Sequence, residues 1–401
     1  MSASPLLTPR EGTPPLSDTP EDFARAAAAL ARGRGPFAVD TERASAYRYD
    51  DRAFLLQVRR RGAGTFLFAP EGYRSELSAA LVPVLNGAEW VLHAAASDLP
   101  SLLALGLRPG RLFDTELASR LAGFARVNLA AMTEELCGYA LAKGHGAEDW
   151  STTPLPAEWL TYAALDVETL LDLADALAEI LDSQGKLPWL EQDCAALIAA
   201  TALPERRWTA LKGLGRLRRP ADLAHARALW EAREELAARH DAAPGTLLPD
   251  KVLLAIASDP PARAGHLWQV PGYSRRCDKH SQAWMRALRR VRDLDPAQYP
   301  EAPAPARIPS HSRWPQVAPQ AAAALAKAKE AFRLFSEETG TPVENLLRPK
   351  ILRRVIWDAV EERRLHDAAD LRAELEQRGA RPWQRDLSAA LLGPVLWDLA
   401  V

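Results

Sequence analysis

Apolar residues in the first half of the chain alternate between short continuous runs and helical spacing. An Ala-rich stretch over residues 21–30 has the helical period and follows Asp18-Thr19-Pro20, which is a helix start signal. Four short apolar runs have the length of buried strands: residues 37–40, 53–58, 65–69 and 89–93. The second and third flank a turn with Gly62 and Gly64 and predict a hairpin. Helical spacing then dominates over residues 117–124, 129–136 and 155–181. The alternation predicts an α/β fold with a mixed sheet.

Strand signals nearly vanish after residue 200, and Ala, Leu, Arg and Glu at helical spacing indicate small helical bundles. Residues 247–253 resemble residues 346–352, and a long amphipathic helix precedes each of these segments. We therefore expect two related bundles. Pro and Ala recur between them and predict a linker. The predicted organisation is a disordered tail over 1–20, an α/β domain over 21–200, helical domains over 204–296 and 320–401, and a linker over 297–319.

Composition describes an ordinary soluble protein of two or three domains: 401 residues, 48% of them hydrophobic and 25% charged. The first 20 residues are rich in Pro, Ser and Thr and lack the apolar core of a signal peptide. The three cysteines are scattered and match neither a disulfide framework nor a zinc site. These features predict a protein of the reducing cytoplasm, without a membrane span.

Charge is distributed unevenly along the chain. Residues 1–200 contain 17 basic and 27 acidic side chains, whereas residues 201–300 contain 18 and 11. An acidic half joined to a basic segment suggests a metal-dependent body with an anion-binding module attached.

Acidic side chains in the first half stand where a strand or a helix would bring them together. On a strand, an Asp and a Glu two residues apart leave the same face, and on a helix a Tyr and an Asp four apart share a face. The spacing alone is weak, because Asp-x-Glu recurs at residues 114–116 and 166–168. The order of these groups within the predicted elements carries more information. The candidate residues are Asp40, Glu42, Asp98, Tyr162 and Asp166.

These residues lie in motifs that resemble ribonuclease D. The motifs are Val39-Asp-Thr-Glu42, Leu92-His-Ala-Ala-Ala-Ser-Asp-Leu99, Phe113-Asp-Thr115 and Tyr162-Ala-Ala-Leu-Asp166. The segment from Leu217 to Tyr273 is similar to the HRDC domain of that family, and the second bundle resembles it more weakly. The resemblance implies a ribonuclease H-like domain of the DEDDy class of 3′–5′ exonucleases, followed by two HRDC-type bundles.

The resemblance also implies roles for individual residues. Asp40, Glu42, Asp98 and Asp166 would bind two divalent cations, Mg²⁺ or Mn²⁺, and Tyr162 would orient the attacking water. Asp114 matches an Asp-Thr of the family outside the metal ligands, and we expect it near the site or at a helix start. Arg43 stands where an aromatic residue is commoner in the family. We expect Arg43 and Lys143 to contact substrate.

The implied function is a monomeric 3′–5′ exoribonuclease that releases nucleoside 5′-monophosphates and matures the 3′ ends of tRNA and other stable RNA. Two alternatives stay open: a DNA exonuclease of the same class, and a non-catalytic protein that binds nucleic acid. Individual residues also have simpler interpretations. Asp98 could cap a helix, Tyr162 could pack in a core, Lys143 could be a solvated loop residue, and His93 could be a hydrogen-bonded residue at a strand end.

Overall fold

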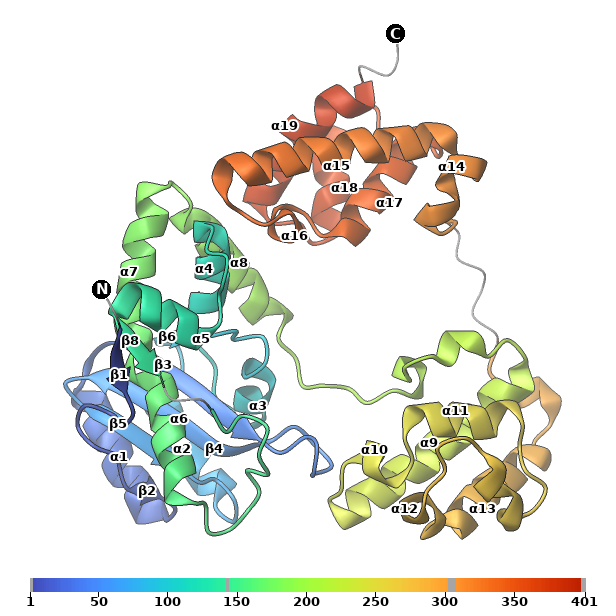
Figure 1. Cartoon of the computed structure of the whole chain (residues 1–401), viewed down its shortest axis with the longest axis horizontal. Helices are drawn as coiled ribbons and strands as arrows, with labels where there is room; N and C mark the ends of the chain where they lie inside the picture. Colours follow the sequence, from blue (N-terminus) through green and yellow to red (C-terminus); the bar gives the residue numbers. More distant parts are fainter. Residues whose placement is uncertain (1–2, 142–143, 302–307, 398–401) are drawn as a thin grey trace.

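The computed structural model describes residues 3–141, 144–301 and 308–397 and shows three bodies (Figure 1). An N-terminal α/β domain holds the sheet, a first helical domain follows it, and a C-terminal helical domain packs against α8 and the end of α4 of the α/β domain. Within those described ranges, no helix combines the length and apolar character that crossing a membrane requires.

A six-stranded mixed sheet organises the α/β domain; the mixed sheet and four of its strands were predicted, whereas β2 and β7 were not. Its order is β2-β5-β4-β3-β6-β7, with β4 antiparallel to both of its neighbours and the other pairs parallel. The predicted hairpin is β4 and β5, which pair from Leu56–Phe68 to Arg60–Gly64. The strands are β2 Leu16–Ser17, β3 Arg34–Arg43, β4 Ala53–Arg61, β5 Gly64–Phe68, β6 Glu89–Leu92 and β7 Arg111–Asp114.

Helices cover both faces of the sheet. Phe37 and Val39 of β3 pack in one cluster with α1 and α2, whereas Ala38 packs with Val167 and Leu170 on the opposite face. The strand alternation therefore places every second residue of β3 beneath α6 and α7. The helices are α1 Pro20–Arg32, α2 Arg74–Leu85, α3 Leu99–Ala104, α4 Thr115–Ala122, α5 Leu129–Met132, α6 Ala157–Glu168, α7 Leu170–Ser183 and α8 Leu187–Ala200.

Two sequence-based expectations for this domain are wrong. The stretch 155–181 is not one helix, because the backbone turns at Thr169 and separates α6 from α7. The tail over residues 1–20 is not wholly disordered. Its strand β1 Ser4–Leu6 pairs with β8 Tyr139–Leu141, and β2 extends the main sheet. Arg10 also donates to Glu168 at 2.8 Å, so long-range contacts order a segment of weak local preference.

The two helical domains repeat the same opening elements. The first has α9 Pro220–His240, α10 Pro244–Leu247 and α11 Asp250–Ser258, followed by α12 Arg275–Asp278 and α13 Ser281–Arg292. The C-terminal domain has α14 Trp314–Val317, α15 Pro319–Thr339, α16 Val343–Leu346, α17 Pro349–Val360, α18 Ala368–Gln377 and α19 Pro382–Trp397. The starts of α15, α16 and α17 each lie 99 residues after those of α9, α10 and α11, so the internal repeat is structural.

The hydrophobic cores do not follow the order of the sequence. One cluster contains Phe23 and Trp90 of the α/β domain together with Trp314 and Phe332 of the C-terminal domain. The first helical domain has a separate core around Trp284. Because Trp314 is fully buried in the shared cluster, the predicted linker over 297–319 is too long at its C-terminal end.

Specific contacts fix the C-terminal domain on the α/β domain. Trp189 and Trp383 stack with their ring centroids 4.4 Å apart. Arg381 pairs with the buried Asp193 at 2.5 Å. The Nζ of Lys186 donates to the carbonyl oxygens of Leu121 and Thr339, one from each domain.

Candidate active site

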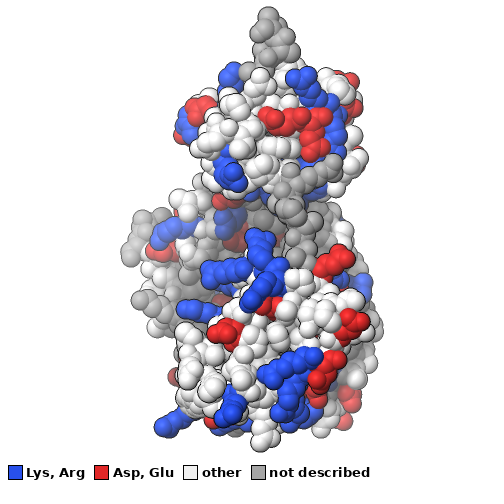
Figure 2. All heavy atoms as spheres, turned by 90° about the vertical axis from the view of Figure 1, so that its right-hand side faces the viewer, with Lys and Arg blue, Asp and Glu red and all other residues white. Residues whose placement is uncertain are grey.

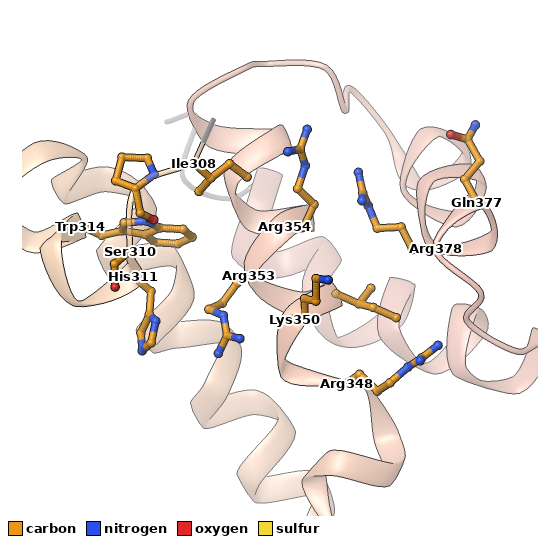
Figure 3. Close-up of a pocket in the computed structure, with 12 residues that line it drawn as sticks. Ile308, Ser310, His311, Trp314, Arg348, Lys350, Arg353, Arg354, Gln377 and Arg378 are labelled. Carbon is orange, nitrogen blue, oxygen red and sulfur yellow. The ribbon is translucent and has the colours of Figure 1, made fainter. Parts of the chain in front are cut away.

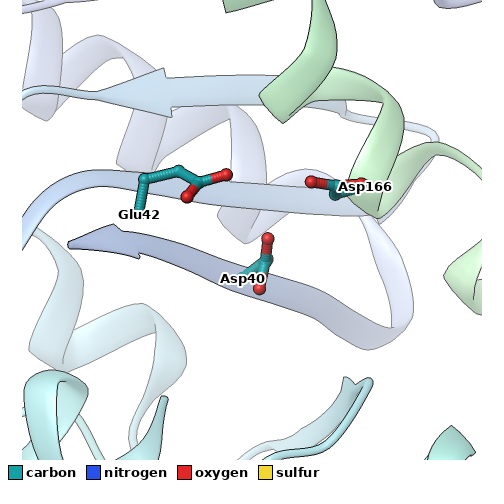
Figure 4. A group of neighbouring side chains, drawn as sticks. All are labelled: Asp40, Glu42 and Asp166. Atoms are coloured by element: carbon teal, nitrogen blue, oxygen red, sulfur yellow. The ribbon is translucent and has the colours of Figure 1, made fainter. Parts of the chain in front are cut away.

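The strand β3 positions the first two candidate carboxylates. Asp40 and Glu42 follow Ala38 at two-residue intervals, so their side chains leave the face of the sheet that α6 and α7 cover. Asp166 projects from α6 toward the same space. Figure 4 shows the three carboxylates turned toward one another. One oxygen from each of Asp40, Glu42 and Asp166 lies within 4.8 Å of the others.

Asp98 lies beside this group rather than within it. It is the residue immediately before α3, but its side chain makes no capping hydrogen bond. Its Oδ1 accepts from Thr41 Oγ1 at 2.7 Å, and its Oδ2 accepts from Ser97 Oγ at 2.9 Å. The interpretation of Asp98 as a helix cap is therefore wrong, and the carboxylate is held next to β3 instead.

Arg43 supplies a positive charge at the edge of the site. Its Nη1 lies 3.4 Å from Asp98 Oδ1 and donates to the carbonyl oxygen of Ser97. Its Nε lies 3.8 Å from Asp51. The guanidinium is thus engaged with the protein itself, and the predicted contact between Arg43 and substrate stays a prediction.

Burial and mutual repulsion make the carboxylates costly to ionise. Burial, followed by the charges of Asp166 and Asp98, raises the pKa of Glu42 to about 9. Burial also raises the pKa of Asp166 to about 7, with a contribution from Asp98. The pKa of Asp40 lies well above its ordinary value for the same reasons, and that of Asp98 is raised by burial although Arg43 opposes the shift.

This donor set fits divalent cations. Among the residues that the structure describes, no Lys or Arg nitrogen lies within 4.0 Å of a carboxylate oxygen of Asp40, Glu42 or Asp166. Clustered carboxylate oxygens without a counter-ion are the ligands that hard divalent cations prefer. Such a cation would offset both the burial and the mutual repulsion that raise these pKa values.

Tyr162 lies one helical turn before Asp166 on α6 and is half-buried. Burial, together with the charges of Asp166 and Glu42, raises the pKa of Tyr162 above its ordinary value. The phenol therefore keeps its proton at neutral pH. Its ring packs beside two other aromatic rings, those of His145 and Trp150, whose centroids lie 5.7 and 6.5 Å from its own. Tyr162 is packed, as the simpler interpretation expected, while its hydroxyl faces the carboxylates.

Two further candidates have structural roles. Asp114 begins α4 and accepts from the backbone N–H groups of Glu116 and Leu117, which confirms the predicted helix start. Its oxygens also accept from Ala94 and Ala95, so it fixes the turn that leads to Asp98. His93 Nδ1 lies 2.8 Å from Thr115 Oγ1, and burial lowers the pKa of His93 to about 4. It is the hydrogen-bonded strand-end residue that we predicted.

Sequence reasoning missed two residues near the site. A Cβ at Gly144 would collide with the ring of Tyr162, so only glycine lets the loop pass over that ring. Gln57 of β4 is the cross-strand neighbour of Asp40 and is fully buried, and its amide has no hydrogen-bond partner in the described structure. Neither belongs to an acidic motif, and the pairing that reveals Gln57 is tertiary. Lys143 lies outside the described residues.

Three family models match the chain in the order of its domains. A model described as 3′–5′ exonuclease matches residues 16–182, and one described as HRDC domain matches residues 222–288. The C-terminal domain matches a model described as 3′ to 5′ exonuclease C-terminal domain over residues 307–396.

Curated relatives and solved structures agree with these matches. Ribonuclease D of Acidiphilium cryptum is 32% identical over 56% of this chain and 58% of its own length. Ribonuclease D of Gluconacetobacter diazotrophicus is 35% identical over 46% of this chain and 48% of its own. The matched regions thus span about half the length of these relatives.

Two solved structures match nearly the whole chain. The crystal structure of a protein from Bifidobacterium adolescentis is 33% identical, with a TM-score of 0.84, and covers 98% of this chain and 99% of its own. Escherichia coli RNase D, an exoribonuclease involved in structured RNA processing, has a TM-score of 0.70 over 96% of this chain and 98% of its own. Its 21% identity supports the shared fold.

Proposed function

We propose that this chain, whose matched domains and curated relatives support ribonuclease D, is a metal-dependent 3′–5′ exoribonuclease that releases nucleoside 5′-monophosphates from RNA 3′ ends. The observation that carries the proposal is the convergence of Asp40, Glu42 and Asp166, with Asp98 beside them. A phosphodiester is already anionic, and its hydrolysis adds negative charge, so a purely acidic site can act on it only together with cations.

The four carboxylates would hold two divalent cations, Mg²⁺ or Mn²⁺, which suit an all-oxygen site. When bound, the pair supplies a water of lowered pKa and neutralises charge on the leaving 3′-oxygen. Thr41 and Ser97 keep Asp98 oriented for its part in this site by their hydrogen bonds.

The role we assign to Tyr162 is to orient the attacking water. Its raised pKa keeps the hydroxyl protonated, so it donates a hydrogen bond and does not act as a base. The packing of Gly144 and His145 against its ring restricts where that hydroxyl can point. Positioning of this kind lowers the entropy cost of bringing water to the phosphorus atom.

We further propose that the protein acts as a cytoplasmic monomer in the 3′ maturation of tRNA and other stable RNA. Its relatives named ribonuclease D support RNA as the substrate class. The quartet of carboxylates does not itself distinguish ribose from deoxyribose, so matched DNA is the necessary comparison.

The test is a degradation assay with 3′-labelled single-stranded RNA and DNA of the same sequence, in Mn²⁺ or Mg²⁺ and in chelator. We expect metal-dependent release of labelled 5′-monophosphate from RNA, which Asp40→Asn reduces by roughly 10²- to 10³-fold. Asp367→Asn, which changes the capping residue before α18 in the C-terminal domain to another good cap, is the matched control and should keep full activity.

Three results would contradict the proposal. Faster loss of DNA than RNA would favour a DNA exonuclease of the same class. Binding without degradation would favour a non-catalytic protein. Activity that Asp40→Asn leaves unchanged would place the chemistry elsewhere.

A further inference from the structure

A pocket of about 660 Å³ in the C-terminal domain lies outside the candidate active site. Figure 3 shows basic side chains of α17 and α18 on one side of it and the segment around His311 and Trp314 on the other. None of its lining residues is acidic, and five of them are Lys or Arg: Arg348, Lys350, Arg353, Arg354 and Arg378.

These five cationic side chains differ in whether a carboxylate pairs with them. Arg354 and Arg378 both pair with Asp358, which is fully buried, at 2.7 and 3.1 Å. Within the described part of the chain, Arg348, Lys350 and Arg353 have no carboxylate within 4.0 Å. The pocket therefore carries three uncompensated positive charges.

The backbone holds these three charges in a defined arrangement. Arg348 is the residue before α17, and Lys350 and Arg353 lie in its first turns, three residues apart and hence on one side of the helix. The N-terminal end of a helix adds a partial positive charge to the same region. Trp314 Nε1 donates to the carbonyl oxygen of Pro309 and fixes the facing wall.

The pocket is also fixed relative to the catalytic domain. Arg381–Asp193 and the stacked Trp189 and Trp383 tie the C-terminal domain to α8. A ligand bound in the pocket would therefore be held at a constant place relative to the carboxylates. Figure 2 shows further Lys and Arg side chains on the part of the first helical domain that faces the C-terminal domain.

We propose that this pocket binds backbone phosphates of the RNA substrate, upstream of the 3′ end that enters the active site. The inference rests on the proposed function, because it takes the polyanion to be RNA. Unpaired Arg and Lys side chains without acidic neighbours are the groups that recognise phosphate independently of base sequence. The site would supply affinity for long substrates and leave the chemical step unchanged.

The test compares RNA binding by the full chain with that of Arg348→Ala/Lys350→Ala/Arg353→Ala. Binding of a 5′-labelled 30-nucleotide RNA is measured in chelator, where no hydrolysis occurs, at several salt concentrations. We expect the variant to bind at least about tenfold more weakly at low salt, and the salt slope to fall by about 2, as expected for three lost phosphate contacts to a single strand. On a trinucleotide, kcat/KM should stay unchanged, since the proposed pocket acts only on nucleotides farther upstream.

Lys327→Ala/Lys329→Ala/Arg333→Ala is the matched control, because it removes three exposed cations of α15 that do not line the pocket. It should bind RNA nearly as the unmodified chain does. If the triple variant has a lower Tm than the unmodified chain, the single substitution Lys350→Glu in the exposed first turn of α17 is tested in its place. It should also bind RNA more weakly.

An unchanged Kd in the pocket variant, or equal weakening in the control, would overturn the proposal. With an unchanged Kd for RNA, an acidic protein partner would be the remaining candidate ligand of the pocket. The two proposals fail separately: degradation of RNA with pocket-independent binding refutes only the pocket, and pocket-dependent binding without degradation refutes only the exonuclease.

Discussion

Arg43 and Asp98 form a charged contact of 3.4 Å at the edge of a site that is otherwise acidic. The guanidinium occupies part of the coordination space of a carboxylate to which we assign a metal. We therefore expect Arg43→Gln to bind Mn²⁺ about three- to tenfold more tightly, because a nearby positive charge is removed. Titration calorimetry with Mn²⁺ in the absence of RNA measures this affinity directly. Arg43→Lys keeps the charge and should resemble the unmodified chain. Weaker binding by Arg43→Gln would mean that Arg43 chiefly positions Asp98.

Replacing a clustered carboxylate should separate stability from activity. Burial and the neighbouring carboxylates force Glu42 either to take up a proton or to hold an unfavourable charge when the metal-free protein folds. Glu42→Gln removes that cost, so we expect the metal-free protein to melt at a higher temperature. The same substitution should abolish most nuclease activity. Glu116→Gln, which removes the partner of Arg120 on α4, serves as the control and should not raise the Tm. A lower Tm for metal-free Glu42→Gln would contradict the repulsion argument.

The pH dependence of stability has a definite sign. In the folded metal-free protein the pKa of Glu42 is about 9 and that of Asp166 about 7, whereas unfolded carboxyls titrate near pH 4. The folded state therefore holds extra protons. This contribution to stability is complete below about pH 4 and is lost as the pH rises through 7 and 9.

We accordingly expect the Tm of metal-free protein to fall between about pH 5 and pH 9, and to fall less in Glu42→Gln. Divalent cations compete with these protons, so the rise in Tm that Mn²⁺ causes should grow with pH. Scanning calorimetry across this range measures both effects. A Tm increment that is independent of pH would argue against metal binding at these carboxylates.

Asp114 should matter for activity although it lies outside the carboxylate group. Its oxygens accept from four backbone N–H groups, at Ala94, Ala95, Glu116 and Leu117. Asp114→Asn replaces one acceptor oxygen by a donor, and we expect a loss of about 1–3 kcal/mol in the free energy of unfolding. The released turn should displace Asp98 and lower kcat. Denaturant titration and single-turnover rates measure the two effects, and full activity at normal stability would refute this role.

Breaking the contact between the α/β and C-terminal domains should destabilise them together. Arg381→Leu leaves Asp193 buried without its cationic partner, at a cost of about 3–5 kcal/mol. Because the first helical domain has its own core, calorimetry should show two transitions, and only that of the shared core should shift. A shift of both transitions would mean that the three bodies unfold as one unit.

The strands β3, β4, β5 and β6, the hairpin and the helix start at Asp114 could be predicted from sequence because each depends on local apolar runs and turn residues. The pairing of β1 with β8 could not, since three residues gain their order from a partner more than 130 positions away. The hydrogen bond that Asp98 accepts from Thr41 could not be predicted either, because Ser97-Asp98 fits a helix-capping sequence equally well. The acidic group was accessible because its members sit on a strand and a helix whose periodicities are visible.

The core that joins Phe23 to Phe332 has a consequence for synthesis. During translation the sheet emerges first, but the residues that complete its hydrophobic cluster emerge only after the first helical domain. The first helical domain can fold in between as a self-contained insertion. The shared core therefore should finish folding only after α15 and the helices that follow it have emerged, and a nascent chain stopped before α15 would expose that incomplete core.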